Sequence, residues 1–240
     1  TDGWEWTLTG QFLEIYNEKI RDLLATKKTR KEDVTYAIKT DSNGRKSVTN
    51  LRRVKLDTAE QVTELMRVAS ENRSVASTEM NAVSSRSHSV FTLSLQGVHM
   101  EHNIELNGSL HLVDLAGSER LSRSKAKGKN LRETKNINKS LSCLADVFMA
   151  LREKRSHVPY RNSKLTYLLQ ECFSKDGKTM MLVNVSPTMQ SYPETMCSLR
   201  FAKQVNQTEL GRAKARVSRA DNSSSSASSG GKKRKESPVK

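Results

Sequence analysis

The stretch HLVDLAGSER, residues 111–120, joins an apolar run to two acidic residues. The leucine and valine after the histidine predict the end of a buried β-strand, and Asp114 places a carboxylate where that strand stops. Gly117 allows the backbone to approach another group closely, and Glu119 adds a second acid. A strand that ends in a carboxylate and a glycine is typical of a loop that senses a bound phosphate.

A second polar segment, NAVSSRSH, occupies residues 81–88. A strand-like run follows it, then a polar turn region at 99–108, and then the strand that ends at Asp114. Because an antiparallel pair returns to the edge it left from, we expect residues 84–88 and 114–119 to lie side by side. This pairing predicts a planar ion pair between Arg86 and Glu119, although a purely structural ion pair is the simpler interpretation of the isolated sequence.

Side chains in these two segments are suited to a metal and a phosphate. The hydroxyls of Ser84, Ser85 and Ser87 are oxygen donors for Mg²⁺ or partners for phosphate oxygens. Asp114 can hold Mg²⁺ directly or through water, as strand-end aspartates do in nucleotide hydrolases. The pattern therefore predicts a nucleotide-driven switch.

Strand-like and helix-like segments alternate around these motifs. Runs rich in β-branched and apolar residues predict strands at 7–16, 34–39, 47–54, 89–98, 109–115 and 179–185. Capping signals and 3.6-residue apolar spacing predict helices at 57–72, 131–151, 165–173 and 191–206. The alternation favours an α/β layer structure around a mostly buried sheet.

The charge divides the chain of 240 residues into two predicted parts. Residues 211–240 hold nine basic and two acidic side chains in a serine- and glycine-rich sequence, so we expect a disordered basic tail there. The remaining +8 of the net +15 falls on a folded domain at 1–210. A basic folded surface predicts an acidic partner, which is nucleic acid, anionic lipid or a protein with an acidic face.

Other signals limit the setting of the protein. The three cysteines form no CxxC pair, which predicts neither a zinc site nor a disulfide framework and fits a cytosolic or nuclear protein. The apolar runs are far shorter than the roughly 20 residues that span a bilayer, so we expect no membrane association. The basic run Lys232–Lys235 beside Ser237-Pro238 is typical of a nuclear import signal, but such combinations also recur by chance in basic tails.

The two polar segments resemble known motifs: NAVSSRSH is similar to switch I of kinesins, and DLAGSER to their switch II. The resemblance continues in the same order along nearly all of the folded part, in EIYNEKIRDLL (14–24), LRETKNINKSLSCL (131–144), HVPYRNSKLTYLLQ (157–170), LVNVSP (182–187) and SLRFAKQVN (198–206). It implies a nucleotide-hydrolase fold of the phosphate-loop type, with a mixed central sheet and helices on both faces.

The same resemblance implies a missing part. Kinesins carry a GxxxxGK[ST] phosphate loop upstream of the EIYNE segment. The GKT at Gly177–Thr179 has Cys172 five positions before its glycine and precedes a strand-like run, so it is interpreted as a turn. We therefore expect that the first third of the motor, with three central strands and the phosphate loop, is absent, and that this fragment alone is inactive.

The resemblance implies ATP and Mg²⁺ as cofactors and gives roles to numbered residues. Ser85 would hold Mg²⁺, with Asp114 acting through water. Catalysis would fall to Ser84, Arg86, Gly117 and Glu119, and nucleotide binding to Asn81, Ser84, Ser85, Asp114 and Gly117. The Gly117 amide would contact the terminal phosphate, and the Arg86–Glu119 pair would close around the attacking water.

The resemblance also implies a microtubule as the partner, because kinesins bind tubulin through the loop after switch II, the helix that follows it and the HVPYRNSK segment. The basic residues of these segments are Arg123, Lys125, Lys127, Lys129, Lys135, Lys139, Arg161 and Lys164. Each alone is also explained as an ordinary surface charge, and the prediction concerns the cluster.

Two segments resemble the C-terminal, minus-end-directed class of kinesins, known as kinesin-14. These are GWEW at 3–6 and NQTELGRAKAR at 206–216. The class implies a coiled-coil neck upstream that makes a dimer, and a place on cytoplasmic or spindle microtubules.

Three functions follow from these patterns. The first is a fragment of a microtubule motor ATPase. The second is a microtubule-binding module without ATPase activity, because the phosphate loop is absent. The third is nucleic-acid binding driven by charge, which the sequence supports least because it lacks aromatic residues interleaved with the basic ones.

Overall fold

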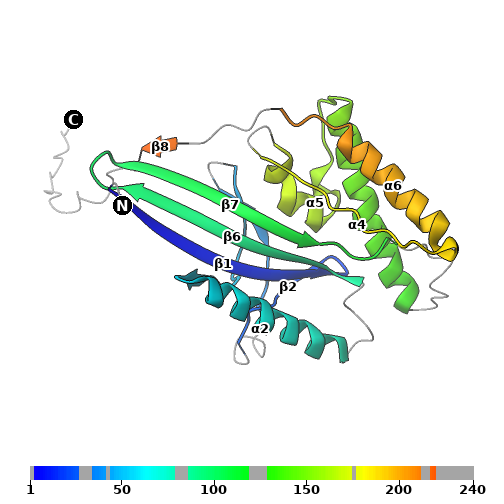
Figure 1. The fold of residues 1–240 in the computed structure, drawn as a ribbon, viewed down its shortest axis with the longest axis horizontal. Helices are drawn as coiled ribbons and strands as arrows, with labels where there is room; N and C mark the ends of the chain where they lie inside the picture. The colour runs from blue at the N-terminus through cyan, green and yellow to red at the C-terminus, as the bar shows by residue number, and fades with distance from the viewer. Residues whose placement is uncertain are drawn as a thin grey trace, which may run out of the picture.

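Three long strands lie side by side at the centre of the fold (Figure 1). They are β1 (Trp4–Tyr16), β6 (His88–His99) and β7 (Ile104–Asp114). The structure is a computed structural model that describes residues 3–26, 34–41, 44–78, 86–118, 129–174, 177–211 and 217–219. The sheet order is β2-β1-β6-β7-β8, with β5 also pairing with β1, where β2 is Lys19–Asp22, β5 is Val54–Leu56 and β8 is Val217–Arg219.

Helices cover both faces of this sheet, as the resemblance implied (Figure 1). Helix α2 (Ala59–Thr78) packs Leu65 and Ala69 against Phe91 of β6. The opposite face packs Leu13 and Val90 against the other helices. These are α4 (Lys129–Arg152), α5 (Lys164–Leu168), the 3₁₀ helices η2 (Tyr160–Asn162) and η3 (Leu169–Phe173), and, around the rim, η4 (Met189–Ser191) and α6 (Tyr192–Asn206). Alternating strand residues supply the two faces, which explains the α/β layering.

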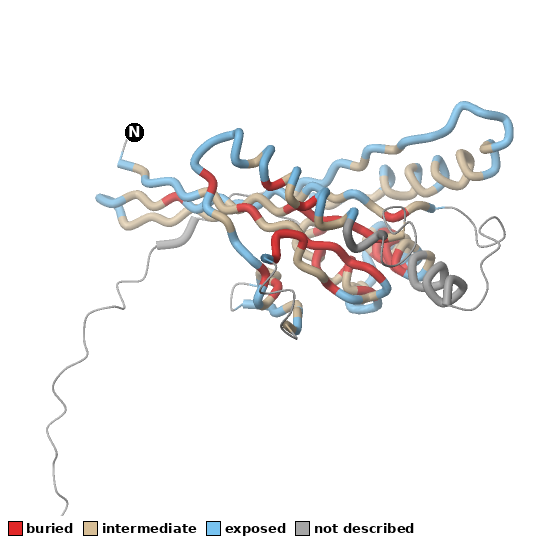
Figure 2. The backbone as a smooth tube through the Cα atoms, turned by 90° about the horizontal axis from the view of Figure 1, so that it is seen from below, coloured by how far each residue is buried: buried red, intermediate tan, exposed pale blue. Residues whose placement is uncertain are grey.

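The apolar spacing identified in the sequence forms the larger core. Val147 and Phe148 of α4 are buried and pack with Leu165 and Phe173, which belong to the stripe expected at 165–173. That stripe is one surface but two elements, because α5 tightens into the 3₁₀ helix η3 after Leu168. Buried residues gather on this side and thin out toward the tip of the long strands (Figure 2).

The sheet differs from the expected one in two respects. Every pair among the described strands is antiparallel, so the mixed sheet is not present in this part of the chain. The sheet is also less buried than predicted at β7, whose Leu110 and Leu112 are 52% and 49% exposed. The reason is topological: β7 pairs with β6 along its length, but with β8 only at 104–106 on its other edge.

The strand predicted at 179–185 is wrong. Residues 177–187 contain no helix or strand, and Met180 and Leu182 are 83% and 76% exposed. Strand propensity reports how well side chains fit a pleated surface, and the ladder itself needs a neighbouring backbone. No described strand pairs with this segment.

The region predicted as two strands at 34–39 and 47–54 forms three short ones. Strands β3 (Ile38–Thr40) and β4 (Lys46–Val48) make a separate hairpin, and β5 then joins the main sheet. Asn50 separates β4 from β5 with a φ of 60°, a left-handed conformation that a continuous strand does not contain.

The far tip of the sheet is an aromatic cluster. Trp4 and Trp6 stack at 5.3 Å between ring centroids, and the Trp4 ring meets His99 edge-on at 5.2 Å. The turn between β6 and β7 covers only residues 100–103, shorter than the predicted 99–108, because Glu105 accepts a cross-strand hydrogen bond from Gln96 and so extends β7. Among the described residues, no helix has the length and apolar character needed to span a bilayer.

Candidate functional site

The register of β6 and β7 brings the two polar segments together. Ser89 lies opposite Asp114, so the start of β6 and the end of β7 meet at the same edge of the sheet. This confirms the predicted neighbourhood for the described residues 86–88 and 114–118. Asn81, Ser84, Ser85 and Glu119 lie outside the described residues. The Arg86–Glu119 ion pair therefore stays a prediction.

A buried ionic network that the sequence analysis missed connects this edge to the rest of the fold. Arg73 of α2 donates from Nη1 to Oδ2 of Asp114 at 3.0 Å, and its Nε lies 3.6 Å from Oε1 of Glu14. Arg73 also donates to the carbonyl and the hydroxyl of Ser87. Glu14 is 1% exposed and has Arg21 at 3.5 Å as a second cation.

This network has a signal in the sequence. Glu14 stands inside the apolar strand FLEIY, and a carboxylate in a buried strand needs a cation and hydrogen bonds to offset its lost hydration. Ser87 supplies one of these hydrogen bonds, because its hydroxyl is fully buried and donates to Glu14 at 2.6 Å. The expectation that Ser87 is a metal or phosphate ligand is therefore wrong.

His88 is a second buried connection at the same edge. The Ala116 amide donates to its Nδ1 at 3.0 Å, and its Nε2 lies 2.7 Å from the hydroxyl of Ser140 in α4. Burial lowers the pKa of His88 to about 4; Asp114 raises it and Arg73 lowers it further. The imidazole is consequently neutral near pH 7.

The described part of the edge is compatible with a hydrated cation. Asp114 ends β7 with a side chain that is 67% exposed, although one of its oxygens is held by Arg73. Gly117, three residues after the end of β7, is half-exposed. A carboxylate in this position fits the oxygen chemistry of Mg²⁺. The GKT segment does not contribute, since the Gly177 amide donates to the Ser174 carbonyl and closes a turn, as predicted.

The predicted partner-binding residues divide into three groups. Arg123, Lys125 and Lys127 lie outside the described residues. Lys129 and Lys135 lie in α4, for which the backbone alone is described at these positions. The remaining three are on the surface, Lys139 and Arg161 exposed and Lys164 half-exposed.

The β3–β4 hairpin adds cations that the prediction omitted. Thr40 lies 3.1 Å from the Tyr167 hydroxyl, Lys46 Nζ sits 4.4 Å from the centre of the Tyr167 ring, and Arg161 lies 5.4 Å from the same ring. The Lys46 amide also donates to Glu171. The hydrogen bond with Thr40, then the charges of Lys46 and Arg161, lower the pKa of Tyr167.

The hairpin had a signal in the sequence, because the dipeptide Asn43-Gly44 between two basic strand-like runs is typical of a tight β-turn. Lys139 belongs to the same neighbourhood. Glu18 accepts a hydrogen bond from the Lys164 amide, and Glu18 and Lys139 both act on the Cys143 thiol, whose pKa is raised mainly by burial. We define the basic face as Lys46, Lys139, Arg161 and Lys164.

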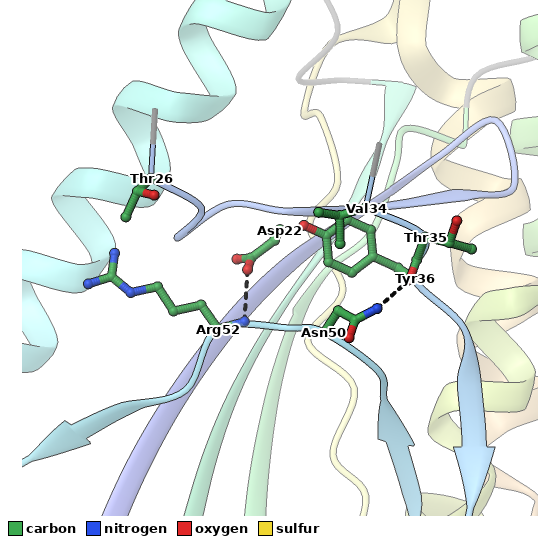
Figure 3. Close-up of a pocket in the computed structure, with 7 residues that line it drawn as sticks. All are labelled: Asp22, Thr26, Val34, Thr35, Tyr36, Asn50 and Arg52. Carbon is green, nitrogen blue, oxygen red and sulfur yellow. Dashed lines mark hydrogen bonds between the residues drawn. The ribbon is translucent and has the colours of Figure 1, made fainter. Parts of the chain in front are cut away.

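A cleft of about 650 Å³ lies away from both of these regions (Figure 3). Its lining residues are Asp22, Thr26, Val34, Thr35, Tyr36, Asn50 and Arg52. Burial raises the pKa of Asp22, which accepts amide hydrogen bonds from Leu24 and Arg52, each at 2.8 Å. These contacts tie the end of β2 to the segment before β5, so the polar groups of the cleft serve the fold.

Comparison with known proteins identifies the family these features belong to. The family profile described as kinesin motor domain matches residues 1–208. Kinesin-like protein KIN-14N of Oryza sativa subsp. japonica is 50% identical over 214 residues, which cover 88% of this chain and 28% of the rice protein. The chain therefore spans less than a third of the length of that relative.

Solved structures agree in fold. A C-terminal motor and motor homology domain of Kar3Vik1, fused to a synthetic heterodimeric coiled coil, has a TM-score of 0.74 and 45% identity over 86% of this chain and 53% of its own. The structure of a fast kinesin, described with its ATPase mechanism and interactions with microtubules, has a TM-score of 0.80 and 37% identity, covering 93% of this chain and 62% of its own.

Two arginines of the same helix provide a test of the buried network. We expect Arg73→Ala to lower the free energy of unfolding by about 3 kcal/mol, because it leaves Glu14 short of its buried partners. Arg67→Ala removes an exposed pair with Glu64 and Glu71 and should cost less than about 1 kcal/mol. Urea unfolding followed by circular dichroism measures both, and equal losses would contradict the network.

The neutral His88 predicts a pH dependence of stability. Its pKa is about 4 in the folded chain and near 6.5 when exposed, so the unfolded chain binds the extra proton between these values. Stability is therefore complete above pH 6.5 and falls by up to about 3 kcal/mol as the pH drops to 4. His88→Gln should flatten this part of the profile, measured as unfolding midpoints at half-unit steps. An unchanged slope would show that His88 is not buried as a neutral ring.

Proposed function

The chain belongs to the kinesin motor-domain family, and on that premise we propose that it forms the switch and track-binding part of a microtubule motor ATPase. The observation that supports this most directly is the register of β6 and β7, which brings Ser87 and His88 beside Asp114 and Ala116. Two loops that leave a common edge can contact the same terminal phosphate. A change at that edge then reaches both segments together.

The residues of this edge have separable tasks. When bound, ATP with Mg²⁺ supplies the phosphoryl group and the charge that neutralises it. Asp114 would hold the cation, directly or through water, and Arg73 positions that carboxylate by donating a hydrogen bond to it. The Gly117 amide meets the terminal phosphate. Ser84, Ser85 and Asn81 complete the binding set, and Arg86 with Glu119 closes around the attacking water.

The basic face supplies the contact with the track. Its four cations come from β4, α4, η2 and the first residue of α5, and Tyr167 holds two of them in place. Tubulin has an acidic surface, so such a face favours association through complementary charge. We include Lys125, Lys127, Lys129 and Lys135 in the proposed contact with the track as well. The net charge of +8 on residues 1–210 then serves binding to this acidic surface.

The direction and assembly follow the C-terminal-motor class. The KIN-14 name of the rice relative and the GWEW and NQTELGRAKAR segments support movement toward the microtubule minus end. The coiled coil in the Kar3Vik1 structure supports a dimer made through a segment beyond this chain. We place the protein on cytoskeletal or spindle microtubules, with Lys232–Lys235 as a nuclear import signal.

The tail begins at residue 211 in this proposal and contacts the domain through one short strand. The family match ends at residue 208, close to the boundary at 210/211. Residues 217–219 add the short strand β8 to β7, and residues 220–240 lie outside the described residues. A microtubule-binding module without ATPase activity is the alternative function, and the family match favours the motor over it.

Two carboxylates on β7 test the nucleotide role. The experiment uses the longest protein that the gene encodes. We expect Asp114→Asn to lower the microtubule-stimulated ATPase rate about 100-fold, because the cation loses its charged partner. Glu105→Gln, on the same strand at the other end, should change the rate less than twofold, since Glu105 accepts hydrogen bonds from Gln96 and Asn107 far from the edge that holds Asp114. Comparable rates for the two variants would remove Asp114 from the site.

Charge reversal tests the basic face on the 240-residue chain itself. We expect Arg161→Glu with Lys139→Glu to weaken co-sedimentation with microtubules about tenfold at moderate salt. The matched control reverses two exposed lysines elsewhere, Lys55 on β5 and Lys203 on α6, and should bind nearly as the parent chain does. Equal weakening would mean that net charge alone drives binding, and tighter binding to DNA than to microtubules would favour the nucleic-acid function.

A further inference from the structure

His88 connects three elements through a single buried ring. The residue begins β6, and its side chain is 3% exposed. One ring nitrogen accepts from the Ala116 amide at 3.0 Å, and the other lies 2.7 Å from the Ser140 hydroxyl. Ala116 stands between Asp114 and Gly117, and Ser140 lies in α4 beside the exposed Lys139. The ring therefore links the phosphate-sensing edge to the helix that carries part of the basic face.

The hydrogen bonds fix the tautomer of the ring. Nδ1 accepts from the Ala116 amide, so it carries no proton. A neutral imidazole then has its proton on Nε2, and Nε2–H donates to the Ser140 hydroxyl. Both partners are buried, since Ser140 is 2% and Ala116 is 5% exposed. Neither bond is readily replaced by water, and a lost bond would leave an unpaired polar group inside the protein.

The rigidity of the ring makes its two bonds interdependent. An imidazole holds its two nitrogens at a fixed separation, so it cannot follow Ser140 without turning away from Ala116. A shift of α4 by one or two ångströms, which is usual for helices in switching proteins, exceeds the tolerance of a hydrogen bond of 2.7 Å. The position of α4 and the conformation of the backbone at Ala116 are then coupled through His88.

We propose that His88 is a positioning residue that couples the backbone at Ala116 to helix α4 through the hydroxyl of Ser140. The coupling rests on the proposed function for its biological meaning, because it would carry the state of the phosphate edge to the basic face. The two hydrogen bonds that make the coupling are present in the structure whether or not the proposed function is correct. His88 contacts neither nucleotide nor track in this scheme, and acts by holding two moving parts in register.

The test is amide hydrogen exchange at Ala116 in the 240-residue chain. Ser140→Ala changes a residue of α4, yet it should speed exchange at the Ala116 amide at least about tenfold, because the freed ring no longer holds its acceptor in place. Ser142→Ala is the matched control, an exposed serine on the same helix, and should leave that amide unchanged. Ser140→Thr retains the hydroxyl and should restore protection.

Each outcome decides the coupling. If His88→Gln exposes the Ala116 amide while Ser140→Ala does not, the two bonds are independent and the proposal is overturned. If Ser140→Ala and His88→Gln each speed exchange and the double variant adds nothing further, the two residues act as one unit, as expected. The small size of the Ser140→Ala change keeps the comparison within folded chains.

A second measurement joins the coupling to the motor. In the longest protein that the gene encodes, the ratio of microtubule affinities with ADP and with a non-hydrolysable ATP analogue should move toward one in Ser140→Ala. If the ratio is unchanged, the coupling has only a structural role, and the proposal that it carries the state of the phosphate edge to the basic face is overturned. If the parent protein binds no microtubules, the proposed function fails, and the exchange experiment still judges the coupling.

Discussion

The register of β6 against β7 is the constraint on which the rest of the structure depends. A one-residue slip would turn every side chain of one strand to the opposite face, and would separate His88 from Ala116. Two hydrophobic clusters on opposite faces prevent that slip, because Val90 belongs to one and Phe91 to the other. The core thus fixes the geometry of the chemistry at the sheet edge.

Charge compensation then shapes the edge itself. Glu14 is almost fully buried, and its cations come from the neighbouring strand β2 and from α2. Arg73 forms an ion pair with Glu14 and donates a hydrogen bond to Asp114 with the same guanidinium, so the buried carboxylate and the exposed one share a partner. A planar group with five donors is suited to this task, and lysine is not. A movement of Asp114 that shifts the Arg73 guanidinium therefore also changes the ion pair of Glu14 in β1.

Much of this was predictable from the sequence, and the failures have physical reasons. Strand lengths alone placed residues 86–88 beside 114–118, and the apolar spacing identified the stripe at 165–173. Arg73 was missed because its two acidic partners, Glu14 and Asp114, lie 41 or more positions away, and no local pattern encodes such a pair. The segment 179–185 has the composition of a strand but no described neighbour to pair with. The strand predicted there from composition is therefore wrong. Ser87 was misassigned because its hydroxyl faces inward, which motif spacing does not reveal.

The stacked indoles at the far tip have a practical consequence for optical spectroscopy. The sequence contains two tryptophans, Trp4 and Trp6, and both lie at the start of β1. Their rings contact each other, and the Trp4 ring contacts the imidazole of His99. Tryptophan emission from this molecule therefore reports on the far tip of the sheet, and it does not report on rearrangements near Ala116 at the opposite end. Anyone who follows denaturation by fluorescence alone would record the loss of the tip and could mistake it for the loss of the whole.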